Sequence, residues 1–291
     1  MTAITAVGKV LRGRRRAQLA LLLAAPLGWL VFAYLGSLAV MLFNSLWRFD
    51  GGLQIVIKEL GLSNFEILWK EPVYRTITIR TLGMATLVTL TCAVLAFPIA
   101  FTMAKLAGGR ARRYMLVAVL LPLWASYVVK VYAWRTILAQ EGILNWMLSP
   151  IGLESPGTGG TGLTGVWLAL TYLWLPYMVL PVYAGLERIP DSLIDASSDL
   201  GASPFTTFRK VILPLAFPAV VAGSIFTFSL TLGDYITPSL VSSSQFIGNV
   251  IYAQLGVAGN LPFAAAFAAV PMVIMVAYLL VARRLGAFES L

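Results

Sequence analysis

Residues 81–104 read TLGMATLVTLTCAVLAFPIAFTMA, and these 24 consecutive positions carry no charged side chain. A membrane-spanning helix needs about 20 mostly apolar residues, because the hydrocarbon core is about 30 Å thick and a helix rises about 1.5 Å per residue. This stretch is therefore long enough to cross a bilayer. Together with similar stretches elsewhere, it predicts an all-α polytopic membrane protein.

The composition of the whole chain supports this prediction. Of 291 residues, 59% are hydrophobic and 11% are charged, whereas soluble domains are about half apolar and a quarter charged. Histidine is absent and Cys92 is the only cysteine. A disulfide framework, a histidine or cysteine metal site and a histidine-based catalytic triad are therefore excluded, and we predict no catalytic residue and no metal ligand.

Five further apolar stretches bring the predicted number of spans to six. Residues 235–282 carry no charge over 48 positions, which is too long for one helix. Turn-forming residues in its first half predict an outer loop, with Asn260 or Leu261 near the cap of the last helix and Pro262 in its first turn. The further spans are residues 17–47, residues 114–134 with Lys130 reaching the interface, residues 163–186, residues 211–233 and residues 262–282.

The first span follows a basic segment, residues 1–16. Its 31 apolar residues greatly exceed the apolar region of a cleaved signal peptide, so we expect a retained anchor. After it come an extracytoplasmic loop at 48–80, a core of five helices at 81–284 and a tail at 285–291.

Basic residues in the loops predict the orientation of the chain. With the N-terminus inside, the inner segments hold 14 of the 21 lysines and arginines and the outer segments hold 7. This bias predicts that both termini are cytoplasmic. The net charge of +9 then faces anionic lipid headgroups, and we expect no binding to nucleic acid.

The inner segment at residues 187–214 reads ERIPDSLIDASSDLGASPFTTFRKVILP and is unusually acidic for this surface. Pro190 predicts a helix start, Gly201 predicts a left-handed stop, and Ser203 with Pro204 predicts the start of a second short helix. A helix of about ten residues, about 15 Å long, is therefore expected between Pro190 and Gly201.

This short helix is predicted to have two different faces. Asp191, Asp195 and Asp199 recur every four residues and form one acidic stripe. The opposite face is small and apolar, and it consists of Leu193, Ile194, Ala196, Ser197 and Leu200. Acidic residues are repelled by an anionic leaflet, so the helix suits docking into a groove on another protein. A loop that only caps two membrane helices is the alternative.

The same segment resembles the cytoplasmic signature of permease subunits of bacterial ABC importers. That signature reads EAA, three residues, G, nine residues and I-x-L-P. Here Asp195-Ala196-Ser197 precedes Gly201 by three residues, and VILP at 211–214 follows after nine more. Asp replaces Glu, and Ser replaces the second Ala. In the family this segment is the coupling helix, which sits in a cleft of a separate ATPase. The resemblance therefore implies ATPase contacts at Leu193, Ile194, Asp195, Ala196, Ser197, Leu200, Gly201, Leu213 and Pro214.

Further segments are similar to the spermidine/putrescine importer permeases, and the similarity extends over roughly residues 65–284. They are LLPLW at 120–124 through VYAW at 131–134 to EGILN at 141–145, YLWLPYMVLPVY at 172–183, DLGASP at 199–204 and GDYITP at 233–238. The resemblance implies the type-I ABC importer permease architecture in a bacterial inner membrane, and polyamines as the solute. Related permeases handle other small amines, amino-acid-like compounds and organophosphonates, which remain alternatives.

The resemblance also implies partners, because the chain shows no means of using ATP. It has no G-x-x-x-x-G-K-[ST] loop, and GTGGTG at 157–162 follows Pro156 in a turn-rich loop with no preceding strand, which indicates a linker. We therefore expect no enzymatic activity and no bound cofactor, with ATP and magnesium held by a partner. The expected partners are two ATPase subunits, a second, different permease, an extracytoplasmic substrate-binding protein and the lipid membrane. An independent secondary transporter is the rival class, against which the absence of an apparent inverted repeat argues.

Asp234 is the only charged residue between residues 211 and 282. Ionisable groups near the membrane are costly and are candidate functional residues, and a carboxylate in the outer half of the membrane could pair with a substrate ammonium. A capping carboxylate bonded to local backbone amides is the alternative.

Aromatic residues accompany Asp234 in the predicted solute pathway. Their rings can face ammonium groups or anchor the chain at the membrane interface, and on the fourth span Tyr172, Trp174 and Tyr177 stay ambiguous between these roles. The candidate pathway residues are Trp124, Tyr127, Trp134, Asp234 and Tyr235.

Overall fold

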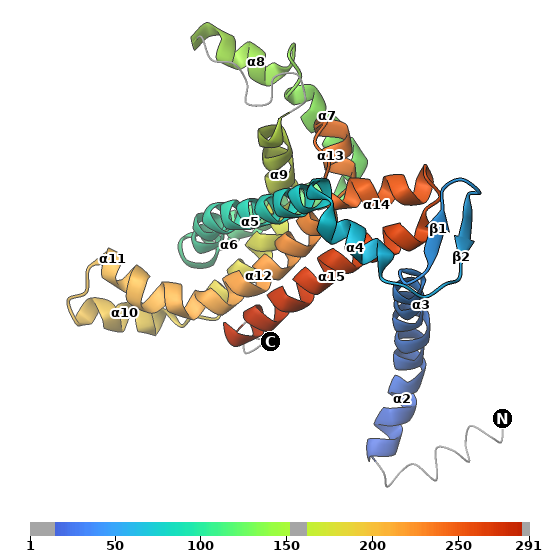
Figure 1. Cartoon of the computed structure of the whole chain (residues 1–291). Helices are drawn as coiled ribbons and strands as arrows, with labels where there is room; N and C mark the ends of the chain where they lie inside the picture. The colour runs from blue at the N-terminus through green and yellow to red at the C-terminus, as the bar shows by residue number, and fades with distance from the viewer. Residues whose placement is uncertain (1–14, 152–161, 287–291) are drawn as a thin grey trace, which may run out of the picture.

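The computed structural model describes residues 15–151 and 162–286, and helices dominate these ranges (Figure 1). The α-helices are α2 (Arg15–Trp29), α3 (Gly36–Asn44), α4 (Ser63–Lys70), α5 (Pro72–Phe101), α6 (Gly109–Trp124), α7 (Tyr127–Ile137), α8 (Ile143–Leu148), α9 (Leu163–Glu187), α10 (Asp191–Asp199), α11 (Pro204–Thr207), α12 (Leu213–Gly233), α13 (Ile236–Val241), α14 (Ile247–Gly256) and α15 (Leu261–Arg284). Short helical segments of other types are η1 (Leu30–Leu35), η2 (Thr102–Leu106), η3 (Ser149–Ile151) and η4 (Phe208–Ile212).

Three predicted segments lie wholly or largely outside the described residues. They are the basic N-terminus at 1–16, the glycine-rich linker at 157–162 and the tail at 285–291.

Five helical stretches in the described ranges are long and apolar enough to cross a membrane. They are Leu22–Asn44, Pro72–Leu106, Leu163–Glu187, Pro204–Gly233 and Leu261–Arg284. The pair α6 and α7 passes the same test only when both helices are taken together. The all-α polytopic fold is therefore confirmed, and the count of six spans holds when this pair is taken as one broken span.

The third predicted span is not the single helix that the sequence suggested. Helices α6 and α7 meet at an angle of 95°. Ala125, with ψ of 142°, and Ser126, with ψ of 135°, adopt extended backbone conformations that end one helix before the next begins. Continuous apolarity indicated one span here, because a hydropathy pattern does not reveal where the backbone leaves the helical region.

The region between the first two spans is more ordered than a plain loop. Strands β1 (Arg48–Asp50) and β2 (Ile55–Ile57) form an antiparallel hairpin, followed by α4. The Asn64 side chain on α4 donates hydrogen bonds to the carbonyls of Ser45 and Trp47, at 2.8 and 2.7 Å. Helix α5 then starts at Pro72, where its fixed φ suits the first helical turn, and so includes nine residues that we had assigned to this loop.

The outer segment before the last span also contains helices, α13 and α14. Ile247 at the start of α14 is fully buried, and its backbone N–H donates to the Thr81 hydroxyl on α5 at 3.1 Å. The predicted cap of the last helix is confirmed, because the Asn260 side chain accepts a hydrogen bond from the Phe263 N–H at 3.1 Å. Pro262 lies in the first turn of α15, as expected.

Helices α5, α9 and α12 form the packed centre of the chain. Small residues let them approach closely, as is common between membrane helices. A Cβ added at Gly185 on α9 would lie 2.3 Å from the Ala219 Cβ on α12, and one at Gly223 on α12 would lie 2.8 Å from the Met178 Sδ on α9. Helices α9 and α12 therefore approach so closely that a side chain at Gly185 would collide with the Ala219 Cβ, and one at Gly223 would displace the Met178 side chain.

The first span stands apart from this centre. None of the residues in the apolar window of Leu22–Asn44 is buried, and Figure 1 shows α2 and α3 extending away from the other helices. The rest of the described chain therefore leaves every side chain in this window at least partly exposed.

Candidate functional site

The acidic inner segment folds as the sequence predicted. Helix α10 covers nine residues, and Pro190 directly precedes it with an extended backbone. Gly201 has φ of +75°, a left-handed conformation. A Cβ at Gly201 would meet no heavy atom within 4 Å, so glycine is needed there for its backbone conformation and not for lack of space.

Helix α11 continues the segment and is tied to α10. Ser203 caps α11 by accepting a hydrogen bond from the Thr206 N–H at 3.3 Å, which confirms the predicted second helix. The hydroxyl oxygens of Ser197 on α10 and Thr207 on α11 are 2.9 Å apart. This hydrogen bond fixes the two short helices relative to each other.

The residues predicted to form the small, apolar face of α10 differ in how far they are buried. Ile194 is partly buried against the central core, and Ser197 faces α11. Leu200, by contrast, is 89% exposed, and Phe205 on α11, which the sequence analysis did not select, is 70% exposed. The exposed surface of this segment therefore includes part of the predicted set, with Phe205 added. The exposed members of that set are Leu193, Asp195, Ala196, Leu200, Gly201, Leu213 and Pro214.

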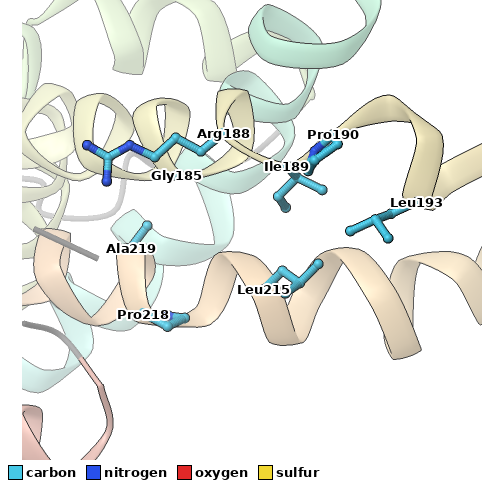
Figure 2. A pocket seen from close by; sticks show the side chains of 8 residues that line it. All are labelled: Gly185, Arg188, Ile189, Pro190, Leu193, Leu215, Pro218 and Ala219. Carbon is cyan, nitrogen blue, oxygen red and sulfur yellow. The ribbon is translucent and has the colours of Figure 1, made fainter. Parts of the chain in front are cut away.

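A cavity of about 280 Å³ lies behind α10, between the end of α9 and the first half of α12 (Figure 2). Leu193 on α10 and Leu215 on α12 line it from opposite sides, and Ala219 lines its far end. The chain connects α10 to α9 and α11 at its two ends, while this mainly apolar cavity separates part of α10 from α12.

Asp234 lies at the other end of α12, one residue beyond that span. Its Oδ1 accepts hydrogen bonds from the backbone N–H groups of Ile236 at 2.9 Å and Thr237 at 3.2 Å. Its Oδ2 accepts hydrogen bonds from the Thr237 hydroxyl at 2.8 Å and from the Tyr127 hydroxyl. Burial raises the pKa of the Asp234 carboxyl, and the hydrogen bonds from Tyr127, Thr237 and Ile236 act in the opposite direction. The carboxylate is therefore a capping group, the alternative we had considered, and it also joins α13 to α7.

A pocket of about 340 Å³ opens beside this carboxylate. Tyr127, Asp234 and Tyr235 line it, so the structure brings together three of the five predicted pathway residues. Trp174 on α9 lines it as well and stacks on the Tyr127 ring, with centroids 5.7 Å apart and an angle of 16°. The Trp174 Nε1 is buried and has no hydrogen-bond partner among the described residues.

The other two predicted pathway residues lie elsewhere. Trp124 is 89% exposed at the end of α6. Trp134 on α7 packs against Tyr172 on α9, with ring centroids 5.5 Å apart. Both residues were selected for their positions in an apolar stretch that was predicted to be one helix. Because the chain bends by 95° after α6, Trp124 does not line the pocket that Tyr127 lines. Trp174 was among the aromatic residues considered, but only the packing of α7 against α9 reveals its place in the pocket.

These features define a class of protein: a multi-pass helical membrane protein with a short exposed helix, α10, at one end of the bundle. The family described as "Binding-protein-dependent transport system inner membrane component" matches residues 96–287. The chain belongs to this family.

Curated relatives make the class more specific. The chain is 48% identical over 284 residues to the inner membrane ABC transporter permease protein YdcU of Escherichia coli K12. The matched region covers 93% of this chain and 90% of YdcU. It is 31% identical over 258 residues to the spermidine/putrescine transport system permease protein PotB of the same organism, covering 87% and 92%. The chain is the permease component of a type-I ABC importer and a multi-pass inner-membrane protein.

Solved structures share the fold at low sequence identity. A chain of the bacterial alginate ABC transporter, solved in complex with an alginate pentasaccharide-bound periplasmic protein, gives a TM-score of 0.70 at 18% identity and covers 94% of this chain and 96% of its own length. A chain of the MetNI methionine ABC transporter in an inward-facing conformation gives 0.59 at 18% identity, covering 76% and 96%. Permease subunits of this kind are not enzymes, and ATP is hydrolysed by a separate ATPase.

Proposed function

We propose that this permease imports polyamines such as putrescine and spermidine, delivered by an extracytoplasmic binding protein. Relatives named spermidine/putrescine permeases support the solute class. The observation that carries the proposal is the pocket lined by the Asp234 carboxylate and by the stacked rings of Tyr127 and Trp174. A carboxylate beside aromatic faces suits an alkylammonium group, which a ring attracts with about 0.5–2 kcal/mol.

The charge of the pocket supports a cation over an organophosphonate. Among its described lining residues, Asp234 is the only charged one. A phosphonate would lie near this negative charge with no lysine or arginine to neutralise it. Small amines and amino-acid-like solutes carry an ammonium group too, so they are the second candidate class.

The hydrogen bonds of Asp234 indicate how an ammonium would reach it. A carboxylate has about four acceptor positions, and four donors occupy them here. A solute ammonium therefore replaces one donor. The Tyr127 hydroxyl is the donor from another helix, and movement of α7 relative to α13 would release it, whereas the two backbone N–H groups belong to the local turn.

The inner segment provides the connection to the energy source in this proposal. The exposed face of α10 docks on an ATPase subunit, and two such subunits hold the ATP and magnesium. Closure of the ATPase pair then displaces α10 and alternates the access of the pocket between the two sides of the membrane. The uncovered first span supports a further partner, a second, different permease, and the loop charges support cytoplasmic termini.

Uptake competition in the assembled complex tests the solute. The complex of permeases, ATPase and binding protein is reconstituted in liposomes, and uptake of labelled putrescine is measured with spermidine, an amino-acid-like amine or a phosphonate as competitor. We expect spermidine to compete most strongly and the phosphonate not to compete. Competition by the phosphonate alone would contradict the cation pocket. Uptake by this chain without an ATPase would instead favour an independent secondary transporter.

A further inference from the structure

Lys105 lies in η2, at the end of the span Pro72–Leu106, and binds the start of the segment that contains α10. Its Nζ lies 2.7 Å from the Asp191 Oδ1 and donates a second hydrogen bond to the Ile189 carbonyl at 2.5 Å. The Lys105 side chain is 9% exposed, whereas that of Asp191 is 79% exposed. A largely buried ammonium needs such partners, because an unpaired buried charge is costly.

Arg112, on the first turn of α6, holds the other end of the same turn. Its Nη1 lies 3.2 Å from the Glu187 Oε1 at the end of α9, and its Nη2 donates to the Ala104 carbonyl at 3.0 Å. The Tyr183 hydroxyl donates to the same Glu187 oxygen at 3.0 Å. Glu187 is therefore held by donors from two helices.

These contacts form one clamp, which we define as Lys105 and Arg112 with their partners Asp191 and Glu187. The two cations lie on one short stretch, residues 105–112, and the two acids bracket the turn that leads from α9 into α10. The paired residues are 86 and 75 positions apart in the sequence. None of the four belongs to the coupling signature at 195–214.

We propose that Lys105 and Arg112 are positioning residues that make η2 and the start of α6 move together with α10. This inference rests on the proposed function of α10 as the receiver of the ATPase motion. Besides its chain connections to α9 and α11 and the packing of Ile194 against the core, α10 is tied to η2 by the ion pair between Asp191 and Lys105. Arg112 ties η2 to α6 through the Ala104 carbonyl, and α6 precedes α7, which carries Tyr127 at the pocket beside Asp234.

The arrangement gives the clamp a direct physical role in coupling. Rigid elements and ion pairs transmit a displacement when they move as one body. A displacement of α10 would otherwise be absorbed by the 187–191 turn and by the cavity between α10 and α12. The ion pairs at the two ends of this turn, at Glu187 and Asp191, keep the turn from deforming. The displacement of α10 is then transmitted to η2 and α6.

A charge-removal experiment tests the clamp in the complete transporter. The double variant Lys105→Met and Arg112→Gln is compared with Arg113→Gln, which removes an exposed charge one residue away that has no ion pair among the described residues. ATPase retention on purification, basal ATP hydrolysis and solute import are measured in liposomes. We expect the double variant to retain the ATPase and to hydrolyse ATP, while import per ATP falls about tenfold, because the ion pairs that link η2 and α6 to α10 and α9 are lost.

Several outcomes separate the clamp from a merely structural role. Unchanged import per ATP in the double variant would contradict the proposal, as would an equal loss in Arg113→Gln. If the double variant fails to assemble, Lys105→Arg, which keeps the charge, with Arg112 unchanged, should restore coupling more fully than Lys105→Met. A wild-type complex that retains no ATPase would count against the proposed function of α10 and not against the clamp.

A distance measurement tests the common motion itself. Arg110→Cys on α6 and Ser192→Cys on α10 are both exposed positions for spin labels, and the native Cys92 is buried. In the complete complex, we expect the distance between these labels to be the same without nucleotide and with bound ATP. In the Lys105→Met and Arg112→Gln background, it should change between the two states. A nucleotide-dependent change in the complex with an intact clamp would overturn the proposal.

Discussion

The two regions to which we assign coupling and solute binding lie at the two ends of α12, and they are built in different ways. At the inner end, α10 and α11 are defined by neighbours in the sequence: Pro190, Gly201 and the cap at Ser203. At the outer end, the pocket is assembled from α7, α9 and the turn at Asp234, which are far apart in the sequence. The proposed coupling region is therefore defined mainly by local sequence, and the proposed solute region by tertiary packing.

This difference predicts which substitutions affect which region. Changes of backbone conformation should act on the inner segment, whereas changes of side-chain chemistry should act on the outer pocket. The contact between α9 and α12 is common to both regions, so a change there should have the largest effect.

Gly185→Ala tests that common contact. The new Cβ would lie 2.3 Å from the Ala219 Cβ, and overpacking between helices costs about 1–3 kcal/mol of stability. We expect a lower Tm of the purified permease complex, measured by thermal unfolding in detergent, and recovery of the Tm when Ala219→Gly is added. The control is Gly83→Ala on α5, where a Cβ meets no heavy atom within 4 Å. A stable Gly185→Ala variant would show that the helices separate easily at this crossing.

Gly201→Val tests the local origin of the inner region. A β-branched residue in the left-handed conformation costs about 1–2 kcal/mol, and it should distort the end of α10. We expect import and stimulated ATP hydrolysis to fall together. Gly201→Asn is the matched variant, because asparagine tolerates this conformation, and it should retain most of the activity. Equal activity of the two variants would mean that the left-handed stop does not matter for coupling.

Asp234→Asn tests the chemistry of the outer pocket. Hydrogen bonds to charged groups contribute about 1.5–3 kcal/mol, so loss of the carboxylate charge should raise the KM for putrescine import by about tenfold or more. The matched control is Asp50→Asn, since the Asp50 carboxylate also caps a turn, accepting from the Gly52 and Leu53 N–H groups, but lies in the hairpin. Equal effects of the two substitutions would remove the reason to assign a solute role to Asp234.

Tyr127→Phe should have the smallest effect and should act in the opposite direction. The phenylalanine keeps the ring that stacks on Trp174 but removes the hydroxyl that bonds Asp234. The solute ammonium then no longer displaces a donor, and the KM should fall by about threefold, as expected for a net hydrogen-bond contribution of about 0.6 kcal/mol. A rise in KM instead would mean that the hydroxyl itself orients the carboxylate for the solute.

The unexpected features of the fold also follow the contrast between local and tertiary origin. The sequence predicted one helix across residues 114–134, but Ala125 and Ser126 end α6 and redirect the chain by 95°. It predicted an outer loop before Pro262, but α14 forms there because Ile247 is buried against α5 and α15. In the first place the apolar composition was interpreted correctly as that of a span but not its break, and in the second the turn-forming residues were interpreted as a loop where short helices form.

The amino-acid sequence by itself determined the helical membrane class, the approximate number of spans, and the start and stop of α10. Charge-free length, proline and glycine act on their immediate neighbours, so their consequences can be deduced along the chain. Only the tertiary structure decided that Tyr127 bonds Asp234, that Trp174 stacks on Tyr127, and that Lys105 pairs with Asp191. Contacts such as those of Tyr127 with Asp234, across 107 positions, and of Lys105 with Asp191, across 86, depend on how whole helices pack, and no local pattern specifies that packing.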